Sequence, residues 1–179
     1  MKLHSKKESM KKNASRRHFV KASLLLTTSL LVPNFIKAKT LNPMTMQDKP
    51  APLNAELVLD FVKNAHGNFE RVKELLEKNP TLLNATWDWG NGDFESGMEA
   101  AGHTGRVQIA EYLLSKGARL NIFCAAMLGR MDIVKPTLEA YPNLKSSKGP
   151  HGLALIHHAE RGGENAKEVL AYLKEIGAA

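Results

Sequence analysis

The fold is decided by one stretch of the sequence, AAGHTGRVQIAEYLLSKGARLN, which runs from Ala100 to Asn121. Small residues end a short helix before a glycine turn, and apolar residues three and four positions apart follow on a second helix. Gly117 then marks the end of this second helix, because glycine readily adopts the left-handed conformation found after helix C-termini. The stretch therefore predicts two antiparallel helices joined by a tight turn.

This pattern resembles the second half of an ankyrin repeat, whose usual form is Ala-Ala-x-x-Gly-His-x-x-Ile-Val-x-x-Leu-Leu-x-x-Gly-Ala-x-x-Asn. Similar helix pairs recur along the chain, and the pattern Leu-Glu-x-x-Pro-x-Leu occurs both at 76–82 and at 138–144. One pair cannot bury its apolar side alone, whereas a row of pairs forms a continuous core. The resemblance implies an all-α fold, an ankyrin-repeat solenoid of about four helix-turn-helix units with degenerate β-turn loops.

The ankyrin-like domain is expected to cover residues 54–179 in four units. Their approximate bounds are 54–86, 87–120, 121–148 and 149–179. Asn54 is a candidate N-cap for the first helix. The third unit is expected to be clipped, because Asn121 leads directly into an apolar helix and leaves no room for a β-turn segment. In such a stack, the short first helices and the turn tips form a concave surface.

The beginning of the chain resembles an export signal. The segment from Ser15 to Lys21 is similar to the twin-arginine motif, and a short apolar run follows it. The matching positions are Arg16, Arg17, Phe19 and Lys21. The apolar run, at 22–32, is shorter than the roughly 20 residues of an ordinary transmembrane helix. We therefore expect a cleaved twin-arginine signal peptide at 1–38, a flexible linker at 39–53, and a periplasmic or secreted protein without a stable membrane anchor.

The net charge of +7 does not indicate nucleic-acid binding, because of where the charges lie. Nine of the 25 basic residues and one of the 18 acidic residues lie within residues 1–38. The rest of the chain therefore holds 16 basic and 17 acidic residues. The domain thus has a formal charge of −1, and a basic phosphate-binding face is not expected. The single cysteine, Cys124, lies in an apolar helix and is expected to be buried and unreactive.

The stretch from Thr86 to Ser96 is unusual, because it holds both tryptophans beside a Gly-Asn-Gly turn. By the repeat register it lies between the first two units, near the concave rim. Aromatic residues on a protruding loop suit protein recognition, since tryptophan is enriched in binding hot spots. Alternatively, the tryptophans pack under the loop and Asp93 caps the next helix. The candidate partner contacts are Trp87, Asp88, Trp89, Asn91, Asp93, Phe94, Met127, Arg130 and His151.

The sequence offers little for catalysis or metal binding. His151, His157 and His158 are close together, but neighbouring helix positions do not converge, and His157 occupies a position where the ankyrin pattern has a structural histidine. His103 lies near a turn and is also expected to be structural. The nearby acidic residues are expected to form a solvated rim: Asp88, Asp93, Glu95 and Glu99. The sequence holds no phosphate-binding glycine loop and no Gly-x-Ser-x-Gly nucleophile motif.

These observations favour a non-enzymatic, monomeric ankyrin-repeat module that binds a protein partner through its concave face. A rigid surface of this kind loses little conformational freedom on binding. No catalytic residue, metal ion or cofactor is expected. The alternative is a small periplasmic hydrolase or metal-dependent enzyme that uses the acidic rim and the histidines.

Overall fold

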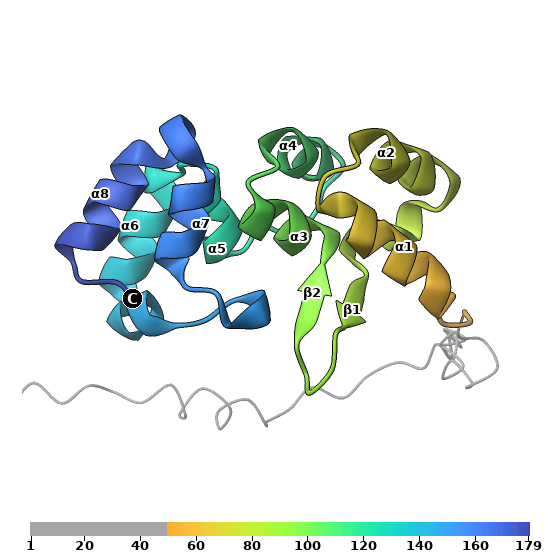
Figure 1. Cartoon of the computed structure of the whole chain (residues 1–179), viewed down its shortest axis with the longest axis horizontal. Coiled ribbons are helices and arrows are strands. Elements are labelled where there is room, and N and C mark those ends of the chain that lie inside the picture. Colours follow the sequence, from red (N-terminus) through yellow and green to blue (C-terminus); the bar gives the residue numbers. More distant parts are fainter. Residues whose placement is uncertain (1–49) are drawn as a thin grey trace, which may run out of the picture. The chain divides into compact units, whose positions relative to one another are not determined.

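The structure is a computed structural model that describes residues 50–179, and these form a mostly helical domain (Figure 1). The expected export motif at Arg16, Arg17, Phe19 and Lys21 lies outside the described residues. Among the helices that are described, none combines the length and the apolar composition needed to span a bilayer.

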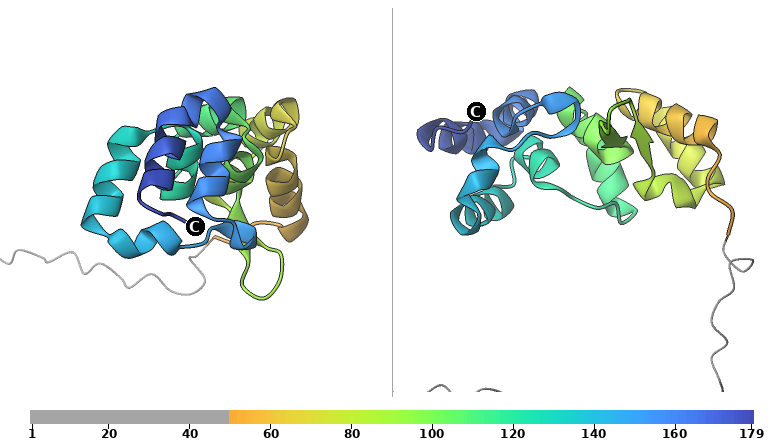
Figure 2. Two further views of the ribbon diagram at one scale, coloured as in Figure 1. Left: turned by 60° about the vertical axis from the view of Figure 1, so that its left-hand side comes forward. Right: turned by 90° about the horizontal axis from the view of Figure 1, so that it is seen from below.

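Within the described residues, four pairs of helices follow one another along the chain (Figures 1 and 2). The pairs are α1 (Ala55–Ala65) with α2 (Phe69–Lys78), α3 (Gly97–Thr104) with α4 (Val107–Ser115), α5 (Ile122–Met127) with α6 (Met131–Ala140), and α7 (Leu155–Arg161) with α8 (Lys167–Glu175). Short 3-10 helices occur at η2 (Pro80–Asn84), η3 (Pro142–Ser146), η4 (Pro150–Gly152) and η5 (Gly163–Ala166). The expected helical class is therefore confirmed, with the exception of one small sheet.

The ends of several helices follow signals in the sequence. The Asn54 side chain caps α1 by accepting a backbone N–H at 3.1 Å, as expected. Asn121 caps α5 in the same way at 2.9 Å, so this helix begins without a preceding β-turn segment. Gly105 and Gly129, which follow the first helices of two pairs, have φ angles of 72° and 71°, a region that favours glycine.

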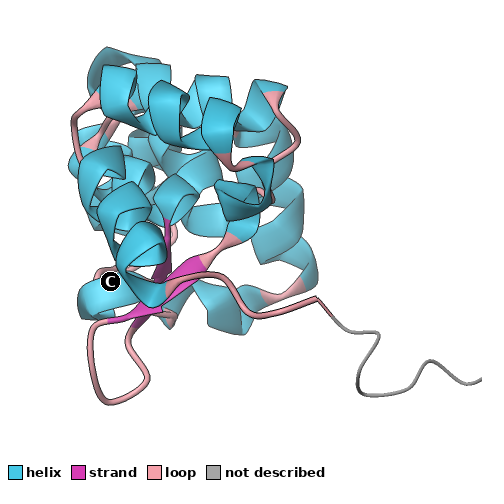
Figure 3. Ribbon diagram, turned by 90° about the vertical axis from the view of Figure 1, so that its right-hand side faces the viewer, coloured by secondary structure: helices cyan, strands magenta, loops and turns pink. Residues whose placement is uncertain are grey.

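The segment between the first two helix pairs is a β-hairpin, where the sequence analysis expected a loop (Figure 3). Strand β1 (Thr86–Asp88) pairs antiparallel with β2 (Phe94–Ser96), and Trp87 lies opposite Glu95. Side chains alternate between the two faces of a strand, so Glu95 is buried while its neighbour Phe94 is exposed. The hairpin projects beyond α1 and α3 (Figure 1).

Helix α3 begins at Gly97, and its N-cap is Ser96 rather than Asp93. The Ser96 hydroxyl accepts the backbone N–H of Glu99 at 3.3 Å, and the Glu99 carboxylate accepts the backbone N–H of Ser96 at 2.8 Å. This reciprocal capping box satisfies two backbone donors that the helix itself leaves free. Strand β2 therefore leads directly into α3, and this connection fixes the positions of both elements relative to each other.

Two clusters of buried apolar residues form the core. The first lies mainly within the first two helix pairs, and the second lies within the last two. The third pair is unusual because α5 has only six residues. Helix α7 contacts α3 as well as α5, so the fourth pair touches the second pair directly. In a regular repeat stack, each pair would contact only its neighbours.

Candidate metal centre

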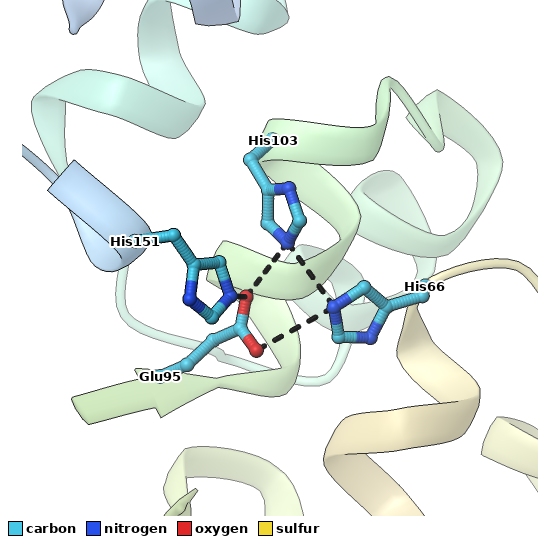
Figure 4. A group of neighbouring side chains, drawn as sticks. All are labelled: His66, Glu95, His103 and His151. Atoms are coloured by element: carbon cyan, nitrogen blue, oxygen red, sulfur yellow. Dashed lines mark hydrogen bonds and ion pairs between the residues drawn. The ribbon is translucent and has the colours of Figure 1, made fainter. Parts of the chain in front are cut away.

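Three histidines and one glutamate from distant parts of the sequence meet beside the hairpin (Figure 4). His66 follows the last residue of α1, and Glu95 is the middle residue of β2. His103 lies in the last turn of α3, and His151 lies in η4. One potential ligand atom from each residue lies within 4.8 Å of the other three. We refer to these four residues as the histidine–glutamate cluster.

The separations within the cluster match those around a small metal ion. His103 Nε2 lies 3.1 Å from His66 Nε2 and 2.8 Å from Glu95 Oε1. His66 Nε2 lies 3.5 Å from Glu95 Oε2, and His151 Nε2 lies 3.3 Å from Glu95 Oε1. A tetrahedral zinc ion with bonds of about 2.0–2.1 Å separates its ligand atoms by about 3.3 Å. These four groups could therefore coordinate one ion if the more distant ligand atoms, which lie up to 4.8 Å apart, moved closer together.

Hydrogen bonds outside the cluster set the orientation of two imidazole rings. His66 Nδ1 lies 3.0 Å from the carbonyl oxygen of Val62, and His151 Nδ1 lies 2.8 Å from Asp93 Oδ2. Because both partners are acceptors, each Nδ1 carries a proton, and a neutral ring then has a lone pair on Nε2. Both Nε2 atoms lie within 3.5 Å of a Glu95 carboxylate oxygen. This arrangement is repulsive unless a metal ion or additional protons lie between these groups.

Glu95 is fully buried, which is rare for a charged side chain without a partner. Its Oε2 accepts a hydrogen bond from Trp89 Nε1 at 2.8 Å. Within the described residues, Oε1 receives no well-directed hydrogen bond, although two imidazole nitrogens lie close to it. Burial raises the pKa of Glu95, but the proximity of His103 and the hydrogen bond from Trp89 outweigh burial, so the pKa is lowered overall. An ionised carboxylate is thus available as a ligand.

Asp93 holds the loop that carries His151. Its Oδ1 accepts the backbone N–H of His151, and its Oδ2 accepts the Nδ1–H, both at 2.8 Å. These contacts, chiefly the backbone hydrogen bond, lower the pKa of Asp93. His151 has a φ angle of 59°, in a region that non-glycine residues seldom adopt. A carboxylate bound to the distal nitrogen of a ligand histidine is the usual arrangement around zinc, where it orients the ring.

Trp89 packs against two histidines of the cluster. Its ring centroid lies 6.4 Å from that of His66 and 6.1 Å from that of His151. The side chains of His66 and His151 remain 30% and 32% exposed, so solvent reaches the cluster. Trp89 therefore orients Glu95 and covers part of the site without closing it.

The chemistry of these donors selects among metal ions. Three imidazole nitrogens and one carboxylate suit Zn²⁺ and similar transition metals, whereas Mg²⁺ and Ca²⁺ prefer oxygen ligands. The thiol of Cys124 is not part of the cluster. As the sequence analysis expected, this thiol is fully buried. Burial raises its pKa well above the usual range, which makes the thiol unreactive.

The hairpin residues proposed as partner contacts differ in exposure. Trp87 is half-buried and packs against the first core cluster. Asp88 and Asn91 are exposed near the turn, where the Asp88 carboxylate accepts the backbone N–H of Gly90 at 2.8 Å. Phe94 is 57% exposed. The hairpin thus presents some of these side chains to solvent and directs others towards the helices.

Two of the sequence expectations are wrong because the side chains are buried. Met127 was proposed as a contact, but it is fully buried in the core. Glu95 was placed on a solvated rim, but it is buried in the cluster. Glu99 is half-buried and also accepts a hydrogen bond from the Asn121 side chain at 2.9 Å. Arg130 is exposed and forms an ion pair with Asp132 at 2.7 Å.

Sequence reasoning expected no metal site and did not single out His66. It grouped His151 with His157 and His158, but neither of these joins the cluster. His157 Nε2 instead lies 3.1 Å from the backbone carbonyl oxygen of His103, in agreement with a structural role. One signal was present: His66 and His103 both lie just before a turn glycine. His66 is one residue before Gly67 and His103 is two residues before Gly105, so both lie at the ends of the first helices of adjacent pairs.

Comparison of the sequence with protein-family models gave no match, and comparison with curated proteins gave none either. The geometry of the cluster is therefore the basis for a functional assignment.

Proposed function

We propose that this domain binds one divalent transition-metal ion through the histidine–glutamate cluster. The observation that carries this proposal is the convergence of three imidazole Nε2 atoms on a buried carboxylate. Zn²⁺ fits these donors well, because it takes four ligands of this kind in tetrahedral geometry. Its charge would also compensate the negative charges of Glu95 and Asp93, whose carboxylates both lie close to the His151 ring.

We further infer that the helix pairs are ankyrin-type repeats. The paired helices, the hairpin between the first two pairs and the positive φ angles of Gly105 and Gly129 support this assignment. Export of the folded domain to the periplasm through a twin-arginine signal in residues 1–38 is proposed from the sequence motif alone.

Titration of the metal-free full chain with ZnCl₂ tests the metal proposal. We expect one tightly bound ion per chain in calorimetry, and a Co²⁺ spectrum with the absorption bands of tetrahedral coordination. Glu95→Gln and His103→Ala each remove a ligand. They should weaken binding by more than the roughly 10- to 100-fold that is typical when an outer hydrogen-bond partner of a ligand is lost.

His157→Gln is a matched control, because it replaces a nearby histidine that lies outside the cluster and keeps a donor for the His103 carbonyl. A second control replaces His4 and His18, the two histidines outside the described residues. Both control proteins should bind zinc as the unmodified protein does. The proposal is wrong if zinc does not bind the unmodified protein. It is also wrong if Glu95→Gln and His103→Ala bind zinc as tightly as the unmodified protein does.

Recognition of a protein partner is a second proposed function, and it is favoured by the exposed aromatic residues of the hairpin. Trp89 is 38% exposed and Phe94 is 57% exposed. A hollow of about 280 Å³ lies beside Phe94 and is also lined by Phe123, Lys148 and Pro150. An exposed aromatic side chain next to a hollow could anchor a partner, since hot spots combine aromatic residues with pockets.

A further inference from the structure

We propose that the metal ion cross-links helix pairs that are not neighbours in the row, and that it holds the loop around His151 closed. This inference rests on the proposed metal binding. His66 belongs to the first pair, Glu95 and His103 belong to the hairpin and the second pair, and His151 lies just before the fourth pair. A single ion would therefore join three of the four pairs.

A cross-link of this kind has a large effect in a repeat architecture. The stability of a repeat stack is approximately a sum over single units and contacts between neighbours, so its ends can open separately. The direct packing of α3 against α7 already joins the second and fourth pairs. Helix α1 also packs against α3, and the cluster would add a direct link from the first pair to the fourth, because His66 lies 3.1 Å from His103 and both surround the carboxylate that His151 approaches.

Pro150 is the only buried residue in the loop at 147–154 that precedes α7, and polar contacts hold the exposed part around His151. The backbone N–H of Gly149 donates to the Leu153 carbonyl at 2.8 Å, and Lys148 forms an isolated bridge with Ala154. The ion pair between His151 and Asp93 joins side chains that are 32% and 31% exposed, and pairs this exposed contribute little to stability. Segments with few buried contacts are the first to open in native proteins.

Metal binding would oppose this opening by mass action. If the ion binds only the closed form, every opening that releases the ion becomes less frequent. The reduction factor is 1 + [L]/Kd, where [L] is the free ion concentration, and it is about 100 when [L] is 100 times Kd. The His151 amide donates to Asp93 and the Gly149 amide donates to Leu153, so the exchange of both amides requires the loop to open. Hydrogen exchange of this segment therefore measures the cross-link directly.

The experiment compares hydrogen exchange of the full chain in excess zinc and in EDTA. We expect zinc to slow exchange by about 10- to 100-fold at 147–154 and at the end of α1. In His151→Ala at saturating zinc, exchange at the end of α1 should still slow, because three ligands remain, whereas exchange at 147–154 should not. His157→Gln, which keeps all four ligands, should behave like the unmodified protein.

The outcomes separate the two proposals. If calorimetry shows zinc binding but exchange at 147–154 does not change, the cross-link is refuted and metal binding stands. Equal slowing at 147–154 in His151→Ala would also refute the cross-link. An absence of zinc binding would refute both proposals. The comparison of zinc-loaded with zinc-free unmodified protein decides the question even if the variant fails to fold.

Discussion

His158 is a fully buried histidine whose environment favours the neutral ring. Its Nδ1 lies 2.9 Å from the Ala154 carbonyl oxygen, and its ring packs against Phe123 at 5.1 Å between centroids. Within the described part of the chain, its buried Nε2 has no hydrogen-bond partner. Burial is the main reason that the pKa of His158 is lowered to about 4. A proton added to Nε2 would thus be a charge without compensation inside the core.

This lowered pKa predicts that the protein loses stability in mild acid. The pKa of an unfolded histidine is about 6.5, so between pH 6.5 and pH 4 the unfolded state binds the extra proton. The contribution of His158 to the free energy of unfolding is therefore complete above pH 6.5 and is lost as the pH falls to 4. It amounts to about 2 kcal/mol between pH 7 and pH 5. Urea unfolding in EDTA at both pH values measures this loss.

The matched variant is His158→Gln, which removes the titrating group. The free energy of unfolding of this variant should fall less between pH 7 and pH 5, by about the same 2 kcal/mol. The other histidines remain in both proteins, so their contributions cancel in the difference. Identical pH dependence in the two proteins would contradict the assignment.

Glu95 shows what sequence reasoning could not reach at the residue scale. Four acidic residues lie close together near the Gly-Asn-Gly turn, and such groups are usually solvated. What decides their environment is strand alternation, which buries Glu95 and leaves Phe94 and Asp88 exposed. Without knowing that this segment is a hairpin, the direction of each side chain could not be assigned.

At the scale of elements, the contact between the hairpin and η4 determines where His151 lies. Asp93→Ala removes both acceptors that hold His151, and we expect zinc affinity to fall by about 10- to 100-fold. Calorimetry checks this value. Asp88→Ala is the matched control, since the Asp88 carboxylate accepts the Gly90 N–H and is not part of the cluster, so its loss should leave the affinity unchanged. Equal affinities in the two variants would show that Asp93 does not position the ring.

The elements themselves were largely predictable. Asn54 and Asn121 cap the helices that were expected to follow them, because a side-chain amide oxygen can accept an N–H of the first turn. The alternative in which Asp93 caps the next helix is wrong, because Ser96 caps α3. The capping box between Ser96 and Glu99, a local signal that the sequence contains, explains the true position.

At the scale of the whole molecule, the partner proposal depends on the exposed aromatic residue at the hairpin. Phe94→Ser should weaken capture of a partner from a periplasmic extract by about 30-fold or more, the loss typical of a hot-spot residue. The melting temperature should not change, because the side chain is 57% exposed. Tyr141→Ser, at a residue that is 66% exposed on another part of the surface, is the control. Equal capture by both variants would contradict the proposal.

The cluster could not be read from the sequence because its members come from separate helix pairs. His66 and His103 are 37 residues apart, and Asp93 and His151 are 58 residues apart. The first two lie close to the ends of the first helices of two adjacent pairs. His151 reaches the cluster because α7 contacts α3, and the six-residue helix α5 lies between their two pairs along the chain. Local periodicity in the sequence contains no information about such a contact.

The shortness of α5 has a further consequence for how the site could change during evolution. Cys124, Ala125 and Ala126 in this helix are small and fully buried, and a Cβ added at Gly102 would lie 2.7 Å from the Cys124 sulfur. A larger residue at Gly102 or Cys124 would push α5 away from α3, and a larger residue at Ala125, which packs in the second core cluster with α7, would push α7 away from α5. Because α7 packs against both α3 and α5, either change would shift His151 relative to the other three residues of the cluster, so selection for metal affinity would keep residues small in a helix that supplies no ligand.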